Sequence, residues 1–258
     1  MSSEPAIVLR DAAFSYGGEP ALQDVTATIS PGDAVALIGP NGSGKSTLLK
    51  ALLGLVQVTA GTIEVLGRSP RAARGLIGFM PQTEELDPEF PVTLRQVVMM
   101  GRYRGLGPAR WPGRADRRAV DEAIARVGLT DRGHARFGEL SGGQQQRGIL
   151  ARAIVSSPRL VLLDEPFNGL DKTNREALLA LVADLRAEGV TIVTSTHDLQ
   201  LASEVCSHAM LLNRSMIAFG PTATTLTLPE IEATFHGLGV EIDEHTLTTP
   251  EHDHGAHG

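Results

Sequence analysis

Short runs of apolar residues alternate with segments of helical periodicity along much of the chain. This alternation predicts an α/β fold built on a parallel sheet. Continuous apolar runs at 34–38 and 160–163 are typical of strands that are buried on both faces. A third strand of this kind is expected at 190–194. Helices are expected from near Gly44 to 53, over about 173–188 and from Asp198 onward.

The first part of the chain is richer in strand patterns. Residues 6–9 and 25–29 are predicted strands, and the glycines and prolines at 17–18 and 31–33 mark turns. Further strands are expected at 61–66 and 76–80, and a hairpin at 210–219 with its turn near Asn213 and Arg214.

The pattern changes after residue 83. Segments 93–100, 115–127 and 142–155 have helical spacing with no strong strand between them, which indicates a helical insertion. From about Gly239 the chain is polar and bears histidines, and we expect a tail there. No internal repeat is visible.

The composition bounds the kind of protein. With 258 residues, 42% of them hydrophobic, the chain can bury the core of one domain, or of one domain with an insertion. A net charge of −7 argues against a nucleic-acid partner, because such binding rests on clustered Lys and Arg. The single cysteine, Cys206, excludes an intrachain disulfide. Its periodic surroundings favour a small buried thiol over a reactive one.

Targeting and membrane signals are not found in the sequence. The first five residues lack the basic start and apolar core of a signal peptide. No apolar run reaches the roughly 18 residues that a membrane-spanning helix needs. We therefore expect a soluble protein in a reducing compartment.

The strongest motif follows the apolar run at 34–38. It consists of Gly39, Pro40, Asn41, Gly42, Ser43, Gly44, Lys45, Ser46 and Thr47. This G-x-x-x-x-G-K-[ST] pattern, placed between a strand and a helix, is typical of a loop that binds nucleotide phosphates. Backbone N–H groups and the helix N-terminus attract the anion. Lys45 is expected to reach the β- and γ-phosphates, and the Ser46 hydroxyl to ligate Mg²⁺. An accidental glycine-rich turn is the alternative.

Two acids end the apolar run at 160–163. Asp164 and Glu165 are expected at the C-terminal end of a buried strand, where ligands of open α/β sheets bind. Two adjacent carboxylates favour a cation, so Asp164 is assigned to Mg²⁺ and Glu165 to polarisation of the attacking water. A helix-capping acid followed by a surface acid is the alternative.

A third motif is formed by Leu140, Ser141, Gly142, Gly143 and Gln144. Taken alone it is an ordinary helix cap, although its helix N-terminus could also bind an anion. The segment resembles the signature of the ATP-binding-cassette (ABC) ATPases. Segments 39–47 and 160–165 match that family's Walker A and Walker B motifs, and the resemblance runs from about residue 6 to 220.

The resemblance implies the fold and its divisions. It implies a P-loop NTPase core with a parallel sheet, an N-terminal antiparallel β subdomain and a helical subdomain inserted at about 84–156. We accordingly expect one ABC ATP-binding domain over 6–238 and a histidine-bearing tail over 239–258.

The resemblance also assigns single residues. Tyr16 resembles the aromatic that stacks on adenine, although an aromatic covering the core is the alternative. Gln82 matches the glutamine that contacts Mg²⁺ and water. Asp171 matches the D-loop aspartate that crosses to a partner subunit, and it could equally end a turn as a helix N-cap. His197 matches the histidine that bonds the γ-phosphate, where a structural histidine is the alternative.

The same resemblance implies partners. ATP and Mg²⁺ held by one copy would be capped by Ser141 and Gly143 of a second copy, in an ATP-sandwich dimer. Transport would need separate transmembrane permease subunits, docking near residues 82–105 at the cytoplasmic face of the membrane. An extracellular substrate-binding protein would act through the permease.

The cargo is suggested by a weaker resemblance. The phrasing of segment 101–118 resembles the manganese, zinc and iron import subfamily, which implies that a divalent metal, manganese first, is moved. The six arginines of this segment form a solvated helical face, or they contact anionic headgroups or a partner's acids. In the tail, metal binding is the alternative to a solvated segment. Its histidines are His245, His252, His254 and His257.

Other readings compete with metal import. A siderophore importer or an exporter would share the chemistry and differ in cargo. A soluble ABC ATPase acting on DNA or ribosomes normally needs two cassettes or a long coiled coil, which 258 residues do not hold. A small kinase or GTPase would leave the segment 140–144 unexplained.

Overall fold

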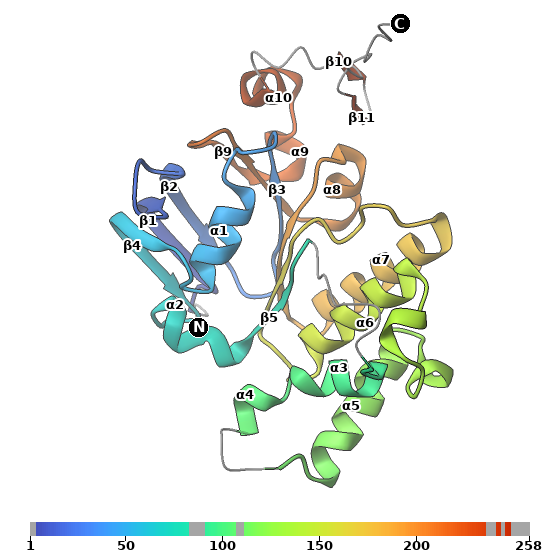
Figure 1. Ribbon diagram of the computed structural model, residues 1–258. Helices are drawn as coiled ribbons and strands as arrows, with labels where there is room; N and C mark the ends of the chain where they lie inside the picture. The colour runs from blue at the N-terminus through green and yellow to red at the C-terminus, as the bar shows by residue number, and fades with distance from the viewer. Residues whose placement is uncertain (1–3, 83–90, 107–110, 236–240, 244–245, 249–258) are drawn as a thin grey trace, which may run out of the picture.

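The computed structural model describes residues 4–82, 91–106, 111–235, 241–243 and 246–248. Figure 1 shows two sheets with α1 between them and most of the other helices on the far side of the larger sheet. The larger sheet has six strands in the order β5-β6-β7-β3-β8-β9, and the smaller has three in the order β2-β1-β4. All neighbours in the larger sheet are parallel except the hairpin β8–β9. The predicted α/β fold with a parallel sheet is confirmed.

The strands are β1 (Ile7–Ser15), β2 (Leu22–Ile29), β3 (Ala34–Ile38), β4 (Gln57–Val65), β5 (Ile77–Met80), β6 (Leu160–Leu163), β7 (Thr191–Ser195), β8 (His208–Leu212), β9 (Met216–Pro221), β10 (Glu241–Asp243) and β11 (Thr246–Thr248). The helices are α1 (Lys45–Leu52), α2 (Pro70–Ala73), α3 (Leu94–Met100), α4 (Tyr103–Leu106), α5 (Arg114–Arg126), α6 (Gly142–Ile154), α7 (Lys172–Ala187), α8 (Leu199–Val205), α9 (Thr222–Thr225) and α10 (Leu228–Phe235). Short 3₁₀ turns lie at 74–76, 130–132 and 137–139. In the described ranges, no helix combines the length and apolarity needed to cross a bilayer.

The larger sheet is buried on both faces, as its continuous apolar runs predicted. Ala34, Ala36 and Ile38 of β3 pack into a core shared with α3, α5, α6 and α7. Val35 and Leu37, which point to the opposite face, pack into a second core with α1 and the antiparallel sheet. The sheet is therefore the partition between two cores, and its strands are held from both sides.

All three strands of the antiparallel sheet are longer than their patterns predicted, and β2 starts at Leu22 instead of Val25. β1 continues to Ser15 past an irregularity in its pairing near Asp11, whose φ is 44°. Such a bulge interrupts the alternation on which the prediction rested. β4 starts at Gln57, four residues before its predicted start, and its first residues are exposed.

The predicted helical insertion is seen as α3, α5 and α6, while the assigned domain boundaries stay a prediction. Arg102 of the arginine-rich segment is not simply solvated, since it donates to Asp116 Oδ1 at 2.8 Å and Asp116 is 7% exposed. Arg118 does lie on a solvated face. Arg110 lies outside the described residues.

The predicted tail contains the short antiparallel pair β10–β11, in which Ile242 is paired with Leu247. Its four histidines lie outside the described residues. Within the described part of the chain, no three His, Cys, Asp or Glu residues gather as a metal site. Metal binding by the tail stays a prediction.

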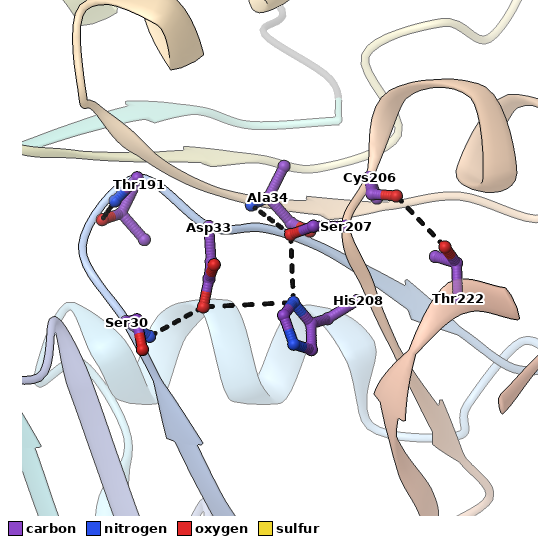
Figure 2. Close-up of polar contacts among 9 residues, drawn as sticks. Ser30, Asp33, Ala34, Thr191, Cys206, Ser207, His208 and Thr222 are labelled. Carbon is purple, nitrogen blue, oxygen red and sulfur yellow. Dashed lines mark hydrogen bonds and ion pairs between the residues drawn. The ribbon is translucent and has the colours of Figure 1, made fainter. Parts of the chain in front are cut away.

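A cluster of polar residues links β3 to β8 at the N-terminal ends of the two strands (Figure 2). Ser207 Oγ lies 3.1 Å from the Ala34 carbonyl oxygen, to which it donates, and accepts from the Ala34 N–H at 3.2 Å. His208 Nδ1 lies 3.0 Å from the same hydroxyl and 3.9 Å from Asp33 Oδ2. Cys206 is buried beside this cluster, and burial raises the pKa of its thiol to about 12. The thiol is therefore protonated at neutral pH, as expected of a small core residue.

The contact between β5 and α6 requires a glycine. A Cβ atom at Gly78 would lie 2.3 Å from the carbonyl oxygen of Ala153. Because both groups belong to packed backbone, we expect Gly78→Ala to lower the free energy of unfolding by about 1–3 kcal/mol. Urea denaturation measures this. Gly75→Ala is the control, since a Cβ there meets no heavy atom within 4 Å. Equal unfolding midpoints for the two variants would contradict the packing argument.

Candidate active site

The predicted phosphate loop lies between β3 and α1. A Cβ atom at Gly39 would lie 2.0 Å from the carbonyl oxygen of Leu212, so only glycine fits there. Gly42 and Gly44 have φ values of 78° and 105°, which glycine adopts at low cost. Helix α1 begins without a side-chain cap, so its first N–H groups are available to an anion. The local fold fits a nucleotide's phosphates and disfavours an accidental turn.

Lys45 lies folded over this loop. The residue is 7% exposed, and its ammonium donates to the carbonyl oxygens of Gly39 at 2.7 Å and Pro40 at 3.0 Å. Burial lowers the pKa of Lys45, while the nearby carboxylates of Glu165 and Asp164 raise it. The loop carbonyls and the two acids thus hold a buried cation where the motif predicted one.

Asp164 meets two hydroxyls just beyond the end of β6. Ser46 Oγ donates to Asp164 Oδ1 at 3.2 Å, and Ser195 Oγ donates to the same oxygen at 2.6 Å. Asp164 is 5% exposed. A carboxylate and a hydroxyl side by side are the hard oxygen ligands that Mg²⁺ takes. Ser46 and Asp164, two of the three residues predicted to hold Mg²⁺, are therefore brought together.

Glu165 is adjacent and has an unusual backbone. Its φ is 48°, in the left-handed region that few residues other than glycine occupy. Its carboxylate accepts from Gln82 Nε2 at 2.8 Å and from Asn168 Nδ2. Its own N–H donates to Ser195 Oγ at 2.8 Å. Glu165 and Gln82, predicted as neighbours at the reaction centre, are in direct contact.

A pocket of about 540 Å³ opens over these groups. It is lined by Glu19, Pro20, Ala21, Asn41, Gly42, Ser43, Gly44, Lys45, Ser46, Thr47, Gln82, Glu165 and Arg214. Tyr16 does not line it, although Glu19 and the two residues that follow do. Tyr16 is 63% exposed, so it does not cover the core, and its stacking role stays a prediction.

Sequence reasoning missed Glu19, Pro20 and Ala21 of the pocket lining, and also Arg214, Asn168 and Ser195. Arg214 lines the pocket, and its N–H donates to the Ser43 carbonyl oxygen at 2.9 Å. Asn168 donates to the Glu165 carboxylate, and Ser195 contacts both Asp164 and Glu165. Polar residues at the C-terminal end of β7 and directly after β6 are a signal that could have identified Ser195 and Asn168. Arg214 follows a predicted turn and gave no such signal.

The other predicted residues lie outside the pocket lining. Ser141 caps α6, because its Oγ accepts from the Gln144 N–H at 3.4 Å and Gln144 Oε1 accepts from the Ser141 N–H at 3.0 Å. Asp171 caps α7 by accepting from the Asn174 N–H, and this bond lowers the pKa of Asp171. Both capping interpretations are thus correct and leave the proposed roles untested. His197 is exposed just after β7.

Comparison with known proteins decides the family. Residues 22–168 match the family described as ABC transporter, which is more than half of the chain. The chain belongs to the ABC transporter ATP-binding family. It is an ATP-binding subunit of the kind that hydrolyses ATP, as the motifs predicted.

Curated relatives of this ABC ATPase extend over most of its length. It is 45% identical to the manganese transport system ATP-binding protein MntA of Synechocystis, over 84% of this chain and 85% of that protein. It is 42% identical to the chelated iron transport system protein YfeB of Yersinia pestis, over 91% and 80%. It is 38% identical to the zinc transport system ATP-binding protein TroB of Treponema pallidum, over 90% and 87%.

Solved structures agree with the fold of the ABC ATPase. An inward-facing structure described as a metal-chelate type ABC transporter matches with a TM-score of 0.81 and 33% identity over 90% of each chain. An ADP-bound ATP-binding cassette matches with a TM-score of 0.78 at 23% identity, which supports the fold alone.

Glu165→Gln tests the assigned base. We expect nucleotide affinity to be kept and turnover to fall by about 10²-fold or more, because an amide cannot accept the proton of the attacking water. Phosphate release from ATP and binding of a fluorescent nucleotide measure the two quantities. Glu64→Gln, an exposed substitution on β4, is the control that should leave both unchanged. Wild-type turnover of Glu165→Gln would show that another group acts as the base.

Proposed function

We propose that this chain is the ATPase subunit of an importer for a divalent metal ion, with manganese first and zinc or iron next. The observation that carries the proposal is its similarity, over most of both chains, to proteins named for manganese, zinc and chelated iron transport systems. A siderophore importer or an exporter would use the same chemistry on another cargo.

The proposed reaction is hydrolysis of Mg²⁺-bound ATP in the 540 Å³ pocket. The loop and Lys45 bind the β- and γ-phosphates, while Ser46, Asp164 and Gln82 hold the metal. Bound Mg²⁺ neutralises charge that develops on the phosphates. Glu165 accepts a proton from the attacking water, and its hydrogen bond from Gln82, a proposed metal ligand, supports this role. His197 is proposed to bond the γ-phosphate.

A second copy completes the site in this proposal. Residues 140–144 and Asp171 do not line the pocket of their own chain, which supports a role for them towards a neighbouring copy. ATP then joins the two copies, and hydrolysis releases them. In such a cycle the bound nucleotide shifts the equilibrium between the separated and the joined copies.

The permease is proposed to dock beside α3 and α4. A hollow of about 530 Å³ lies there, between β5 and the helical region, and its lining includes Leu55, Met100, Arg102 and Arg104. Leu55 is 59% exposed and Met100 is 38% exposed. Apolar side chains next to arginines fit a helix that carries acids. Docking there would hold the subunit at the cytoplasmic face of the membrane, with the extracellular binding protein acting through the permease.

The cargo is tested in the complete transporter. The ATPase rate of the chain with its co-transcribed permease and binding protein is measured in proteoliposomes. Binding protein loaded with Mn²⁺, Zn²⁺ or chelated iron is added in separate reactions. We expect Mn²⁺ to raise the rate most, and the Glu165→Gln complex to give no response. Stimulation by a metal-free ligand alone would contradict metal import.

Ser141→Arg tests the shared site. Because the long side chain of an arginine at this helix N-terminus would fill the space proposed for the γ-phosphate of a second copy, we expect ATPase activity to fall by about 10²-fold or more. Binding of nucleotide to single copies should be unchanged, since Ser141 does not line the pocket over the loop at 39–47. Equilibrium titration and steady-state assays separate the two effects. Undiminished ATPase activity would contradict a site built from two copies.

A further inference from the structure

Ser195 is a buried hydroxyl between the two acids of the site. It is the last residue of β7 and is 0% exposed. β7 is parallel to β6, with Leu163 paired to Thr194, so Ser195 lies beside the point where the chain leaves β6 as Asp164 and Glu165. Its position follows from the strand register, and polar burial of this kind requires hydrogen bonds.

The Ser195 hydroxyl makes two bonds at once. It donates to Asp164 Oδ1 at 2.6 Å and accepts from the Glu165 N–H at 2.8 Å. A hydroxyl has one donor and two acceptor lone pairs, so one serine can serve both partners. The same Asp164 oxygen accepts from Ser46 Oγ at 3.2 Å. Groups from α1, β7 and the end of β6 therefore converge on one carboxylate oxygen.

The second bond acts on a strained residue. Glu165 has a φ of 48°, a conformation that costs a residue other than glycine of the order of 1–3 kcal/mol. Its N–H bond to Ser195 holds this conformation from the backbone side, while Gln82 and Asn168 hold its carboxylate. Loss of the hydroxyl would remove the acceptor of the Glu165 N–H and free the backbone at this residue.

We propose that Ser195 is a positioning residue for ATP hydrolysis. Its hydroxyl fixes the carboxylate of Asp164 next to Ser46 and fixes the backbone of Glu165 in the conformation that aims its side chain towards Gln82. One group thereby sets the metal ligand and the base relative to each other. The inference rests on the proposed roles of Asp164 and Glu165.

Ser195→Ala in the full-length chain tests this. We expect kcat to fall about 10- to 100-fold, as for a misplaced catalytic group, and the Mg²⁺ concentration for half-maximal activity to rise. Binding of Mn²⁺ to the protein–ADP complex, followed by electron paramagnetic resonance, should weaken in parallel. Binding of a fluorescent ATP analogue without Mg²⁺ should be unchanged, because Ser195 does not line the pocket over the loop at 39–47. Ser195→Thr, which keeps the hydroxyl, should recover most of the activity if its melting temperature is native.

Ser207→Ala is the matched control. It also removes a serine hydroxyl that both donates and accepts a hydrogen bond, here with the backbone of Ala34 where β3 begins (Figure 2). We expect it to lower the melting temperature and to leave kcat and the Mg²⁺ dependence unchanged. Wild-type kcat and Mg²⁺ dependence in Ser195→Ala would overturn the proposal. So would equal losses of activity in the two variants at equal losses of stability.

A parallel measurement separates this inference from its premise. An inactive Glu165→Gln with a fully active Ser195→Ala overturns the role of Ser195 alone. A fully active Glu165→Gln overturns the proposed base, and with it the function assigned to the Ser195–Glu165 bond.

Discussion

The parallel register of β6, β7 and β3 is the constraint on which the site depends. Leu163 is paired with Thr194, and Ser195 with Leu37, so three neighbouring strands end at nearly the same level. Their next residues, at 39, 164 and 196, must therefore emerge at one edge of the sheet. A shift of one residue in any strand would turn its side chains to the opposite face and separate Asp164 from Ser46. The two cores that pack against the sheet make such a shift costly.

The site contains two charged residues, Lys45 and Asp164, at positions where burial disfavours the charged form. Lys45 and Asp164 are both nearly inaccessible to water, and desolvation lowers the pKa of the lysine. Loop carbonyls stabilise the ammonium, and two serine hydroxyls stabilise the carboxylate, so each charge has partners from the backbone or from neutral groups. The Lys45 ammonium complements anionic phosphates, and the Asp164 carboxylate complements a cation. Burying these two charges lowers the folding stability and provides groups that can bind a ligand.

The parts that could be predicted from sequence are those with a strong local signal. β3 and β6 have the bounds that their apolar runs indicated, and the glycines at 39, 42 and 44 indicated the loop. β4 was predicted too short because most of its residues are exposed. Ser195 was missed for another reason: its place at the end of β7 marks it as a candidate, but its contacts depend on which strand lies beside β6, and no local pattern specifies that neighbour. Non-local pairing limits the prediction of a site more than it limits the prediction of its loop.

The two helix caps show that a structural role and a binding role can share one segment. The capping box of α6 uses the N–H groups of Ser141 and Gln144, and therefore does not use those of Gly142 and Gly143. A phosphate bound to a second copy could accept hydrogen bonds from these remaining N–H groups. A Cβ atom at Gly143 would lie 2.4 Å from Asn174, whose amide donates to Asp171. The starts of α6 and α7 are thus packed through the side chain of Asn174, which links the two segments proposed to face a second copy.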